Sequence, residues 1–148
     1  MKIVVSPNPY RDKQFKNARL ACSILREAGA EVALCLPFDV DKTFEIPRDL
    51  HFQDIQKEIK TADMLICFGG DGTILHSSKI ATEHNIPILG VNIGTMGFIA
   101  ELEAGEIELL RKIPKGEYTV EERTMLDVSV GNGRQTLFHE TALNDAVI

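Results

Sequence analysis

Residues 64–76 read MLICFGGDGTILH, a run of apolar residues followed by a glycine-rich turn and the first residues of a helix. Met64 to Phe68 contains no charged side chain, and such runs are typical of strands that are covered on both faces. Thr73 to His84 has the pattern of a helix. A covered strand that leads through a tight turn into a helix predicts a parallel sheet of the α/β class.

The N-terminal segments repeat this alternation of strand and helix. Ile3 to Val5 is a short β-branched run that the sequence Ser-Pro-Asn-Pro stops, so we expect a strand and a turn. Apolar residues recur at helical spacing between Gln14 and Ala28, and Gly29 follows where a helix ends on a left-handed residue. With a second strand over Glu31 to Leu36, this unit predicts a right-handed parallel pair.

The same patterns assign the rest of this region. We expect a long loop, a short helix, a buried strand and a further helix, over Pro37 to Asp54, Ile55 to Ile59, Ile86 to Ile93 and Ala104 to Ile113.

The pattern changes after Lys115 and Gly116. Met125 to Val130 alternates apolar and polar residues, a Gly-Asn-Gly turn follows, and Leu137 to Ile148 is strand-like again, which suggests an antiparallel hairpin. The predicted fold is therefore α/β, with a Rossmann-like open parallel sheet and flanking helices over residues 1–116. The opening hairpin of a truncated all-β domain is expected over residues 117–148.

Composition limits the possible functions. The chain has 148 residues and a formal net charge of -6, which argues against a general nucleic-acid binder but not against a nucleotide-binding protein. No apolar run is long enough for a membrane span, and the first residues are too polar for a signal peptide. The three cysteines, Cys22, Cys35 and Cys67, match no metal-site spacing, and we interpret them as reduced thiols of a cytoplasmic protein.

The glycine-rich turn is the most informative feature. Ligands of open α/β sheets bind at the carboxyl ends of the strands, where Gly69, Gly70 and Gly72 permit unusual backbone conformations and close approach of a phosphate. The helix from Thr73 directs free N–H groups to the same place. Asp71 would repel a bare phosphate, so we interpret it as a group that takes a proton from a hydroxyl, orients it or acts through a metal. The alternative is a structural turn in which Asp71 caps the helix.

The sequence GGDGT at residues 69–73 resembles the signature of a kinase superfamily that includes NAD kinases, diacylglycerol and sphingosine kinases and, more distantly, phosphofructokinases. Leu89 to Glu101 (LGVNIGTMGFIAE) looks like the NAD kinase pattern, a strand that leads into Gly-x-x-Gly-Phe. Lipid kinases carry a Gly-Thr-Gly-Asn-Asp string here, which is absent from this chain. Thr141 to Ile148 (TALNDAVI) is similar to the Asn-Glu/Asp motif of that family.

The resemblance implies roles for individual residues, each with an alternative. Phe98 would lie near the adenine of NAD, or would pack in the core. Asn144 and Asp145 would bind the rest of the dinucleotide, or would form a polar pair in the hairpin. His76 would face the substrate phosphates, or would occupy a surface position of its helix. Arg123 matches a family position to which we assign only a structural role.

The implied reaction is phosphoryl transfer from ATP or polyphosphate to the 2′-hydroxyl of the adenosine ribose of NAD, giving NADP. Asp71 would be the base or would orient the hydroxyl, while Gly69, Gly70, Gly72 and Thr73 would shape the phosphate-binding turn. A divalent cation, Mg²⁺ above all, would be held mainly by the ATP phosphates. The partners implied are NAD and ATP, without nucleic acid or membrane, in a homo-oligomeric full-length protein.

Two rival hypotheses remain, a lipid kinase with the same GGDGT turn and a non-catalytic nucleotide-binding module. Members of the family continue into a full β domain beyond the Asn-Asp motif, whereas this chain stops at Ile148. We therefore expect a fragment that folds in its α/β part, binds nucleotide weakly and turns over poorly or not at all.

Overall fold

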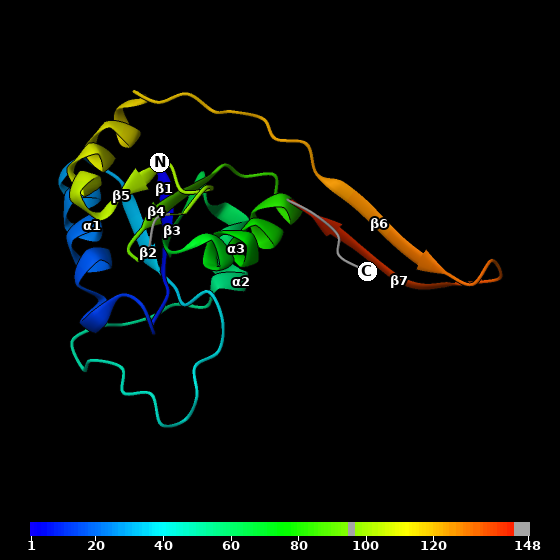
Figure 1. Cartoon of the computed structure of the whole chain (residues 1–148). Coiled ribbons are helices and arrows are strands. Elements are labelled where there is room, and N and C mark those ends of the chain that lie inside the picture. The colour runs from blue at the N-terminus through cyan, green and yellow to red at the C-terminus, as the bar shows by residue number, and fades with distance from the viewer. Residues whose placement is uncertain (95–96, 144–148) are drawn as a thin grey trace. The chain divides into compact units, whose positions relative to one another are not determined.

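A computed structural model describes residues 1–94 and 97–143. The chain divides into two compact units, Met1–Tyr118 and Thr119–Ile148. The first unit contains a parallel sheet with helices on both of its faces (Figure 1). The strands are β1 (Lys2–Pro7), β2 (Glu31–Leu34), β3 (Met64–Gly69), β4 (Ile88–Asn92) and β5 (Leu102–Glu103), in the order β2-β1-β3-β4-β5. The helices are η1 (Lys13–Phe15), α1 (Lys16–Glu27), α2 (Ile55–Glu58), η2 (Ile59–Thr61), α3 (Asp71–Glu83) and η3 (Ala104–Lys115).

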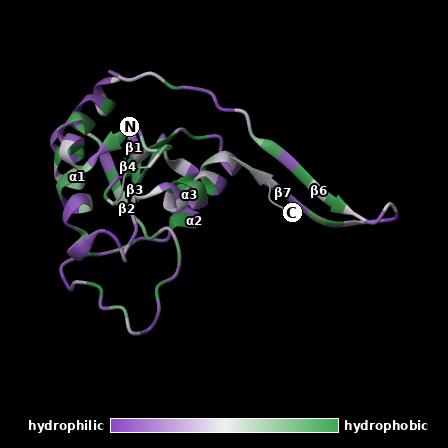
Figure 2. Cartoon of the chain, in the orientation of Figure 1, coloured by the Kyte–Doolittle hydropathy of each residue, from purple (hydrophilic) through white to green (hydrophobic). Residues whose placement is uncertain are grey.

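The alternation of side chains along β1 explains why both faces of the sheet are covered. Ile3 and Val5 point into a core shared with α1 and η3, whereas Val4 points into a second core shared with η2 and α3. All three side chains are fully buried, and each such burial stabilises the fold by about 1.5–3 kcal/mol. Helix α1 carries hydrophobic residues toward the sheet and hydrophilic residues elsewhere (Figure 2). The predicted open parallel sheet with flanking helices is confirmed.

Several predicted boundaries were wrong for physical reasons. β1 continues to Pro7, because it still pairs with β3 there, whereas its pairing with β2 ends at Val5. The proline has no N–H to donate, and with no β2 partner beside it no ladder hydrogen bond is lost. α1 begins at Lys16 rather than at Gln14, because Gln14 and Phe15 have positive φ angles of 53° and 57°. α3 begins at Asp71 rather than at Thr73, with Gly70 as its N-cap residue.

The second unit is a hairpin of β6 (Leu126–Gly131) and β7 (Thr136–Ala142), which pair antiparallel. The predicted hairpin is therefore confirmed over these residues. Large apolar side chains of this hairpin are exposed, namely Leu126, Val130, Leu137 and Phe138.

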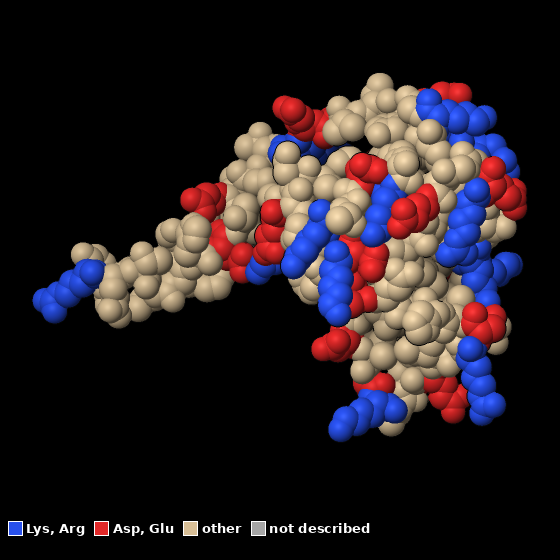
Figure 3. All heavy atoms as spheres, turned by 180° about the vertical axis from the view of Figure 1, so that it is seen from behind, with Lys and Arg blue, Asp and Glu red and all other residues tan. Residues whose placement is uncertain are grey.

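Acidic and basic side chains are interspersed on the face of the molecule seen in Figure 3. Ion pairs of the chain include Lys2 with Glu58 at 2.7 Å and Arg111 with Glu108 at 2.8 Å. Among the helices that the structure describes, none has the length and apolar character required to cross a bilayer.

Candidate functional site

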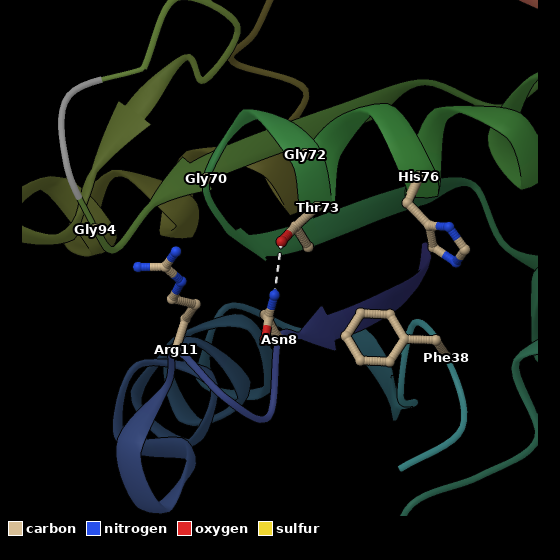
Figure 4. Close-up of a pocket in the computed structure, with 8 residues that line it drawn as sticks. All are labelled: Asn8, Arg11, Phe38, Gly70, Gly72, Thr73, His76 and Gly94. Atoms are coloured by element: carbon tan, nitrogen blue, oxygen red, sulfur yellow. Dashed lines mark hydrogen bonds between the residues drawn. The ribbon is translucent and has the colours of Figure 1, made fainter. Parts of the chain in front are cut away.

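A pocket of about 410 Å³ opens at the carboxyl edge of the parallel sheet (Figure 4). Its volume falls in the range of small-molecule sites, and its place is where open α/β sheets bind ligands. The loops that follow β1, β2, β3 and β4 all contribute to it. The lining residues are Asn8, Arg11, Phe38, Gly70, Gly72, Thr73, His76 and Gly94.

The glycines of the turn matter for the space that they leave rather than for their backbone conformation. A Cβ atom at Gly69 would lie 2.3 Å from the Thr73 hydroxyl oxygen. Residue 69 must therefore be glycine for the Thr73 side chain to pack against the end of β3. At Gly70 and Gly72 a Cβ atom would meet nothing within 4 Å, and both residues line the pocket. The expectation of unusual backbone conformations was wrong, because the positive-φ glycines of the described chain lie elsewhere.

The start of α3 offers hydrogen-bond donors to the pocket. The amides of Thr73 and Ile74 donate to the Gly70 carbonyl, so they are already paired. The amides of Asp71 and Gly72 precede them in the first turn, where a helix has no internal acceptor to offer. Free amides and the positive end of the helix dipole together favour an anion at this position.

The hydroxyl of Thr73 is oriented by a neighbour from the first loop. Asn8 donates from Nδ2 to Thr73 Oγ1 at 2.8 Å, and Asn8 Oδ1 accepts from the Tyr10 amide at 3.0 Å, which fixes the amide orientation. Because the Thr73 oxygen accepts this bond, its own hydrogen remains available for donation. The predicted residue Thr73 therefore takes its orientation from Asn8, which the sequence did not indicate.

His76 stands at the other end of the pocket from Arg11 (Figure 4). Its Nε2 lies 3.1 Å from the Pro37 carbonyl oxygen, so Nε2 carries the hydrogen and donates. Its ring meets Phe38 edge to face, with centroids 5.7 Å apart. His76 is exposed, in line with the alternative of a surface position, and it also lines the pocket, so its role toward substrate phosphates stays a prediction.

Asp71 does not line the pocket. Its half-buried carboxylate accepts hydrogen bonds from the amides of Phe98, at 3.0 Å, and Ile99, at 3.3 Å. Gly97 makes this contact possible, since a Cβ atom there would lie 2.3 Å from Asp71 Oδ1. These hydrogen bonds join the GGDGT turn to the Gly-Phe-Ile segment, residues 97–99. The catalytic role of Asp71 stays a prediction.

Phe98 is 98% exposed, so the alternative that it packs in the core was wrong. Its aromatic ring is free to contact a ligand. Asn144 and Asp145 lie outside the described residues. Arg123 lies in the second unit, where it pairs with Glu121 at 3.8 Å.

The three cysteines are free and buried. Burial raises the pKa of Cys67 to about 12, that of Cys35 to about 12 and that of Cys22 to about 11, so all three are thiols near neutral pH. Among residues 1–94 and 97–143, no group of three His, Cys, Asp or Glu side chains is arranged to hold a metal ion.

Reasoning from the sequence missed Asn8, Arg11, Phe38 and Gly94. Each of them follows a predicted strand, and that position was the available signal, because parallel strands bring their carboxyl ends to one edge. The pattern of the Ser-Pro-Asn-Pro segment indicates a turn and gives no sign of a ligand contact.

Comparisons with known proteins point in one direction. A sequence model of the ATP-NAD kinase N-terminal domain matches residues 3–118. The NAD kinase of Caldanaerobacter subterraneus subsp. tengcongensis is 34% identical over 148 residues, which is 99% of this chain and 51% of that protein. The NAD kinase of Acetivibrio thermocellus is 29% identical over 152 residues, 100% of this chain and 50% of that protein. The chain therefore spans about half the length of these curated relatives.

Two solved structures share the fold. A crystal structure of yeast NADH kinase complexed with NADH aligns with a TM-score of 0.70 at 20% identity, over 97% of this chain and 47% of that one. A crystal structure of an NAD kinase from Archaeoglobus fulgidus in complex with ATP aligns with a TM-score of 0.50 at 19% identity, over 87% and 41%.

Proposed function

From the premise that this chain belongs to the NAD kinase family, we propose that its protein transfers a phosphoryl group from ATP or polyphosphate to the 2′-hydroxyl of the adenosine ribose of NAD, giving NADP. The observation that carries the proposal is the pocket at the carboxyl edge of the sheet, which Gly70, Gly72 and Thr73 of the GGDGT turn help to line. Support comes from the curated relatives, which are named NAD kinases, and from neighbours of the same fold solved with NADH and with ATP.

The turn provides what phosphoryl transfer needs most, which is positioning and neutralisation of charge. In our proposal the free amides at the start of α3 and the Thr73 hydroxyl bind phosphate oxygens. Gly70 and Gly72 leave the space through which the phosphate reaches these donors. Gly69 has the indirect role of allowing Thr73 to take its place.

Asp71 is proposed as the residue that orients the attacking ribose hydroxyl or takes its proton. A carboxylate has about four lone-pair sites. Two of them accept the Phe98 and Ile99 amides, so others remain for a hydroxyl. The same two bonds hold the segment that carries Phe98, the side chain proposed to stack on the adenine of NAD. Asn144 and Asp145 are proposed to bind the rest of the dinucleotide.

A divalent cation, Mg²⁺ above all, is proposed to take part. When bound it would neutralise charge on the donor phosphates. Mg²⁺ keeps several waters and binds readily through substrate phosphates, so we propose that the donor phosphates and water hold most of its coordination sites.

Further properties of the whole protein are proposals of the same kind. They are a cytoplasmic location and a homo-oligomeric state. The rival lipid kinase is not favoured, because residues 89–101 lack the Gly-Thr-Gly-Asn-Asp string and the matching family model is that of NAD kinases.

The substitution Asp71→Asn tests the proposed reaction against a pure binding role. In the full-length protein, we expect the rate of NADP formation from NAD and ATP to fall by about 10²- to 10⁴-fold, since general base assistance is lost. Nucleotide affinity should change by only a few fold. The measurement is a coupled assay of NADP together with titration of NAD binding.

Either of two results would refute the proposal. One is that the unaltered full-length protein forms no NADP. The other is that Asp71→Asn lowers rate and affinity in parallel, as expected of a module that only binds nucleotide. Replacing NAD with a diacylglycerol or a sphingoid base serves as the control for acceptor class.

A further inference from the structure

The pocket contains a cation that the sequence motifs did not indicate. Of the described residues that line it, Arg11 is the only lysine or arginine. In Figure 4 its side chain rises from the first loop toward the side of the pocket where Gly70 and Gly94 are labelled. Gly94 lies on the same side of the pocket, where a Cβ atom would be 4.0 Å from an Arg11 guanidinium nitrogen. The guanidinium thus shares one space with the glycine-rich turn.

The loop that carries Arg11 is firmly anchored. The Asn8 carbonyl accepts from the amides of Arg11, at 3.1 Å, and Asp12, at 2.9 Å, which closes a turn after β1. Asp12 is fully buried, and its carboxylate accepts from Asn17 and from the Ala18 amide at the start of α1. Arg11 therefore projects from a turn that is fixed at both of its ends.

The guanidinium is free to bind an anion. Within residues 1–94 and 97–143 it has no ion-pair partner, in contrast to Arg19 with Asp49 and Arg111 with Glu108. The carboxylate of the glycine-rich motif, Asp71, is turned to the amides of Phe98 and Ile99 instead. A planar guanidinium matches phosphate with two parallel hydrogen bonds, and it keeps its charge at any physiological pH.

We propose that Arg11 binds the phosphate chain of the phosphoryl donor, on the side of the pocket opposite the amides of α3. This inference rests on the proposed kinase function and adds to it the cation that the glycine-rich turn lacks. Asn8 acts as a positioning residue, because it both closes the Arg11 turn and orients the Thr73 hydroxyl. The ligand chemistry is a chain of linked phosphates, in ATP or in inorganic polyphosphate.

The test is a titration of the ¹⁵N-labelled 148-residue chain, followed by NMR. ATP, tripolyphosphate, adenosine and NAD are added separately, and the signals of the Arg11 side chain and of Gly70 and Gly72 are monitored. We expect ATP and tripolyphosphate to shift these signals. Arg11→Ala should raise the dissociation constants of both by about 10- to 100-fold, the usual effect of losing charged hydrogen bonds.

Matched variants separate the role of Arg11 from loss of charge or fold. Lys13→Ala removes the same charge from an exposed side chain two residues away that does not line the pocket, and it should leave both constants unchanged. Arg11→Lys should give an intermediate affinity, since lysine keeps the charge but not the planar fork. Adenosine and NAD should bind Arg11→Ala as they bind the unaltered chain.

The inference is overturned by equal effects of Arg11→Ala and Lys13→Ala, by a loss confined to NAD, or by failure of the unaltered chain to bind either phosphate compound. None of them decides the proposed reaction, which depends separately on NADP formation by the full-length protein. If ATP binding weakens and tripolyphosphate binding does not, the inference also fails, because the phosphate chain would not be what Arg11 holds.

Discussion

The side chain of Asp71 links two sequence motifs. It lies within the GGDGT turn, and its carboxylate holds the amides of Phe98 and Ile99, 27 and 28 residues further along the chain. The position of Phe98 therefore depends on Asp71, whatever contact Asp71 makes with a substrate. An asparagine at position 71 keeps one oxygen acceptor and loses the other. It can therefore keep one of the two hydrogen bonds to the Phe98 segment, which is why we expect Asp71→Asn to change NAD affinity by only a few fold.

The substitution Gly97→Ala tests this coupling without altering the carboxylate. The added Cβ would lie 2.3 Å from Asp71 Oδ1, so the two segments must move apart and their hydrogen bonds must weaken. We expect the free energy of unfolding to fall by about 1–3 kcal/mol, as for other overpacked sites. Urea denaturation of the 148-residue chain measures this change, and a titration with NAD should show weaker binding.

Gly105→Ala is the matched control. It adds the same methyl group at a position where nothing lies within 4 Å, and we expect a change within about 0.5 kcal/mol. If both alanine variants unfold at the same urea concentration, the contact between Asp71 and the Gly-Phe-Ile segment does not contribute to stability.

At the scale of elements, the junction between β1 and α1 depends on one buried carboxylate. Asp12 accepts three hydrogen bonds from the start of α1, at 2.9–3.0 Å. Asp12→Ala would leave these donors without an acceptor in the interior. We expect the free energy of unfolding to fall by about 2–4 kcal/mol, since each unsatisfied buried donor costs about 1–3 kcal/mol. Urea denaturation measures the loss.

Asp54→Ala provides the comparison for this helix start. Asp54 also accepts from a helix amide, that of Gln56 at 3.0 Å, but its side chain is 51% exposed, so water can replace it. The expected loss is about 1 kcal/mol or less. A loss for Asp12→Ala no larger than this would show that burial of the carboxylate adds nothing.

The elements that were predicted well are those whose own residues specify them. β3 and β4 are apolar runs, and Gly29 ends α1 with a φ of 93° as the sequence indicated. β5 was missed because two residues are too few to show a period. The start of α1 was misplaced because burial of Phe15, which is 1% exposed, holds a positive φ that local propensity disfavours.

The same distinction applies to the site, where only its contiguous part could be predicted from the sequence. The GGDGT turn is contiguous, so its position after a strand could be read directly from the sequence. Arg11 and Phe38 reach the same pocket from the loops after β1 and β2, which lie far from the turn in the sequence. Parallel strands all end at one edge, but only the strand order β2-β1-β3-β4-β5 makes these loops neighbours, and single-sequence patterns do not specify that order.

At the scale of the whole molecule, the two units differ in how they bury apolar residues. In the first unit the strands are covered on both faces, and η3 adds the buried Ile107, Leu110 and Ile113. In the hairpin, large apolar side chains are exposed, and an isolated two-stranded hairpin is marginally stable. The stability of the chain should therefore reside in residues 1–118.

Removal of residues 119–148 tests this expectation. Because the hairpin buries little, the shortened chain should lose less than about 1 kcal/mol, which corresponds to a few degrees in Tm. Calorimetry on both chains measures the difference, and hydrogen exchange should show fast exchange in β6 and β7. Removal of residues 104–148 is the control, since loss of three buried side chains of η3 should cost several kcal/mol. If the chain ending at residue 118 unfolds far below the 148-residue chain, the hairpin contributes to folding and the first unit is not autonomous.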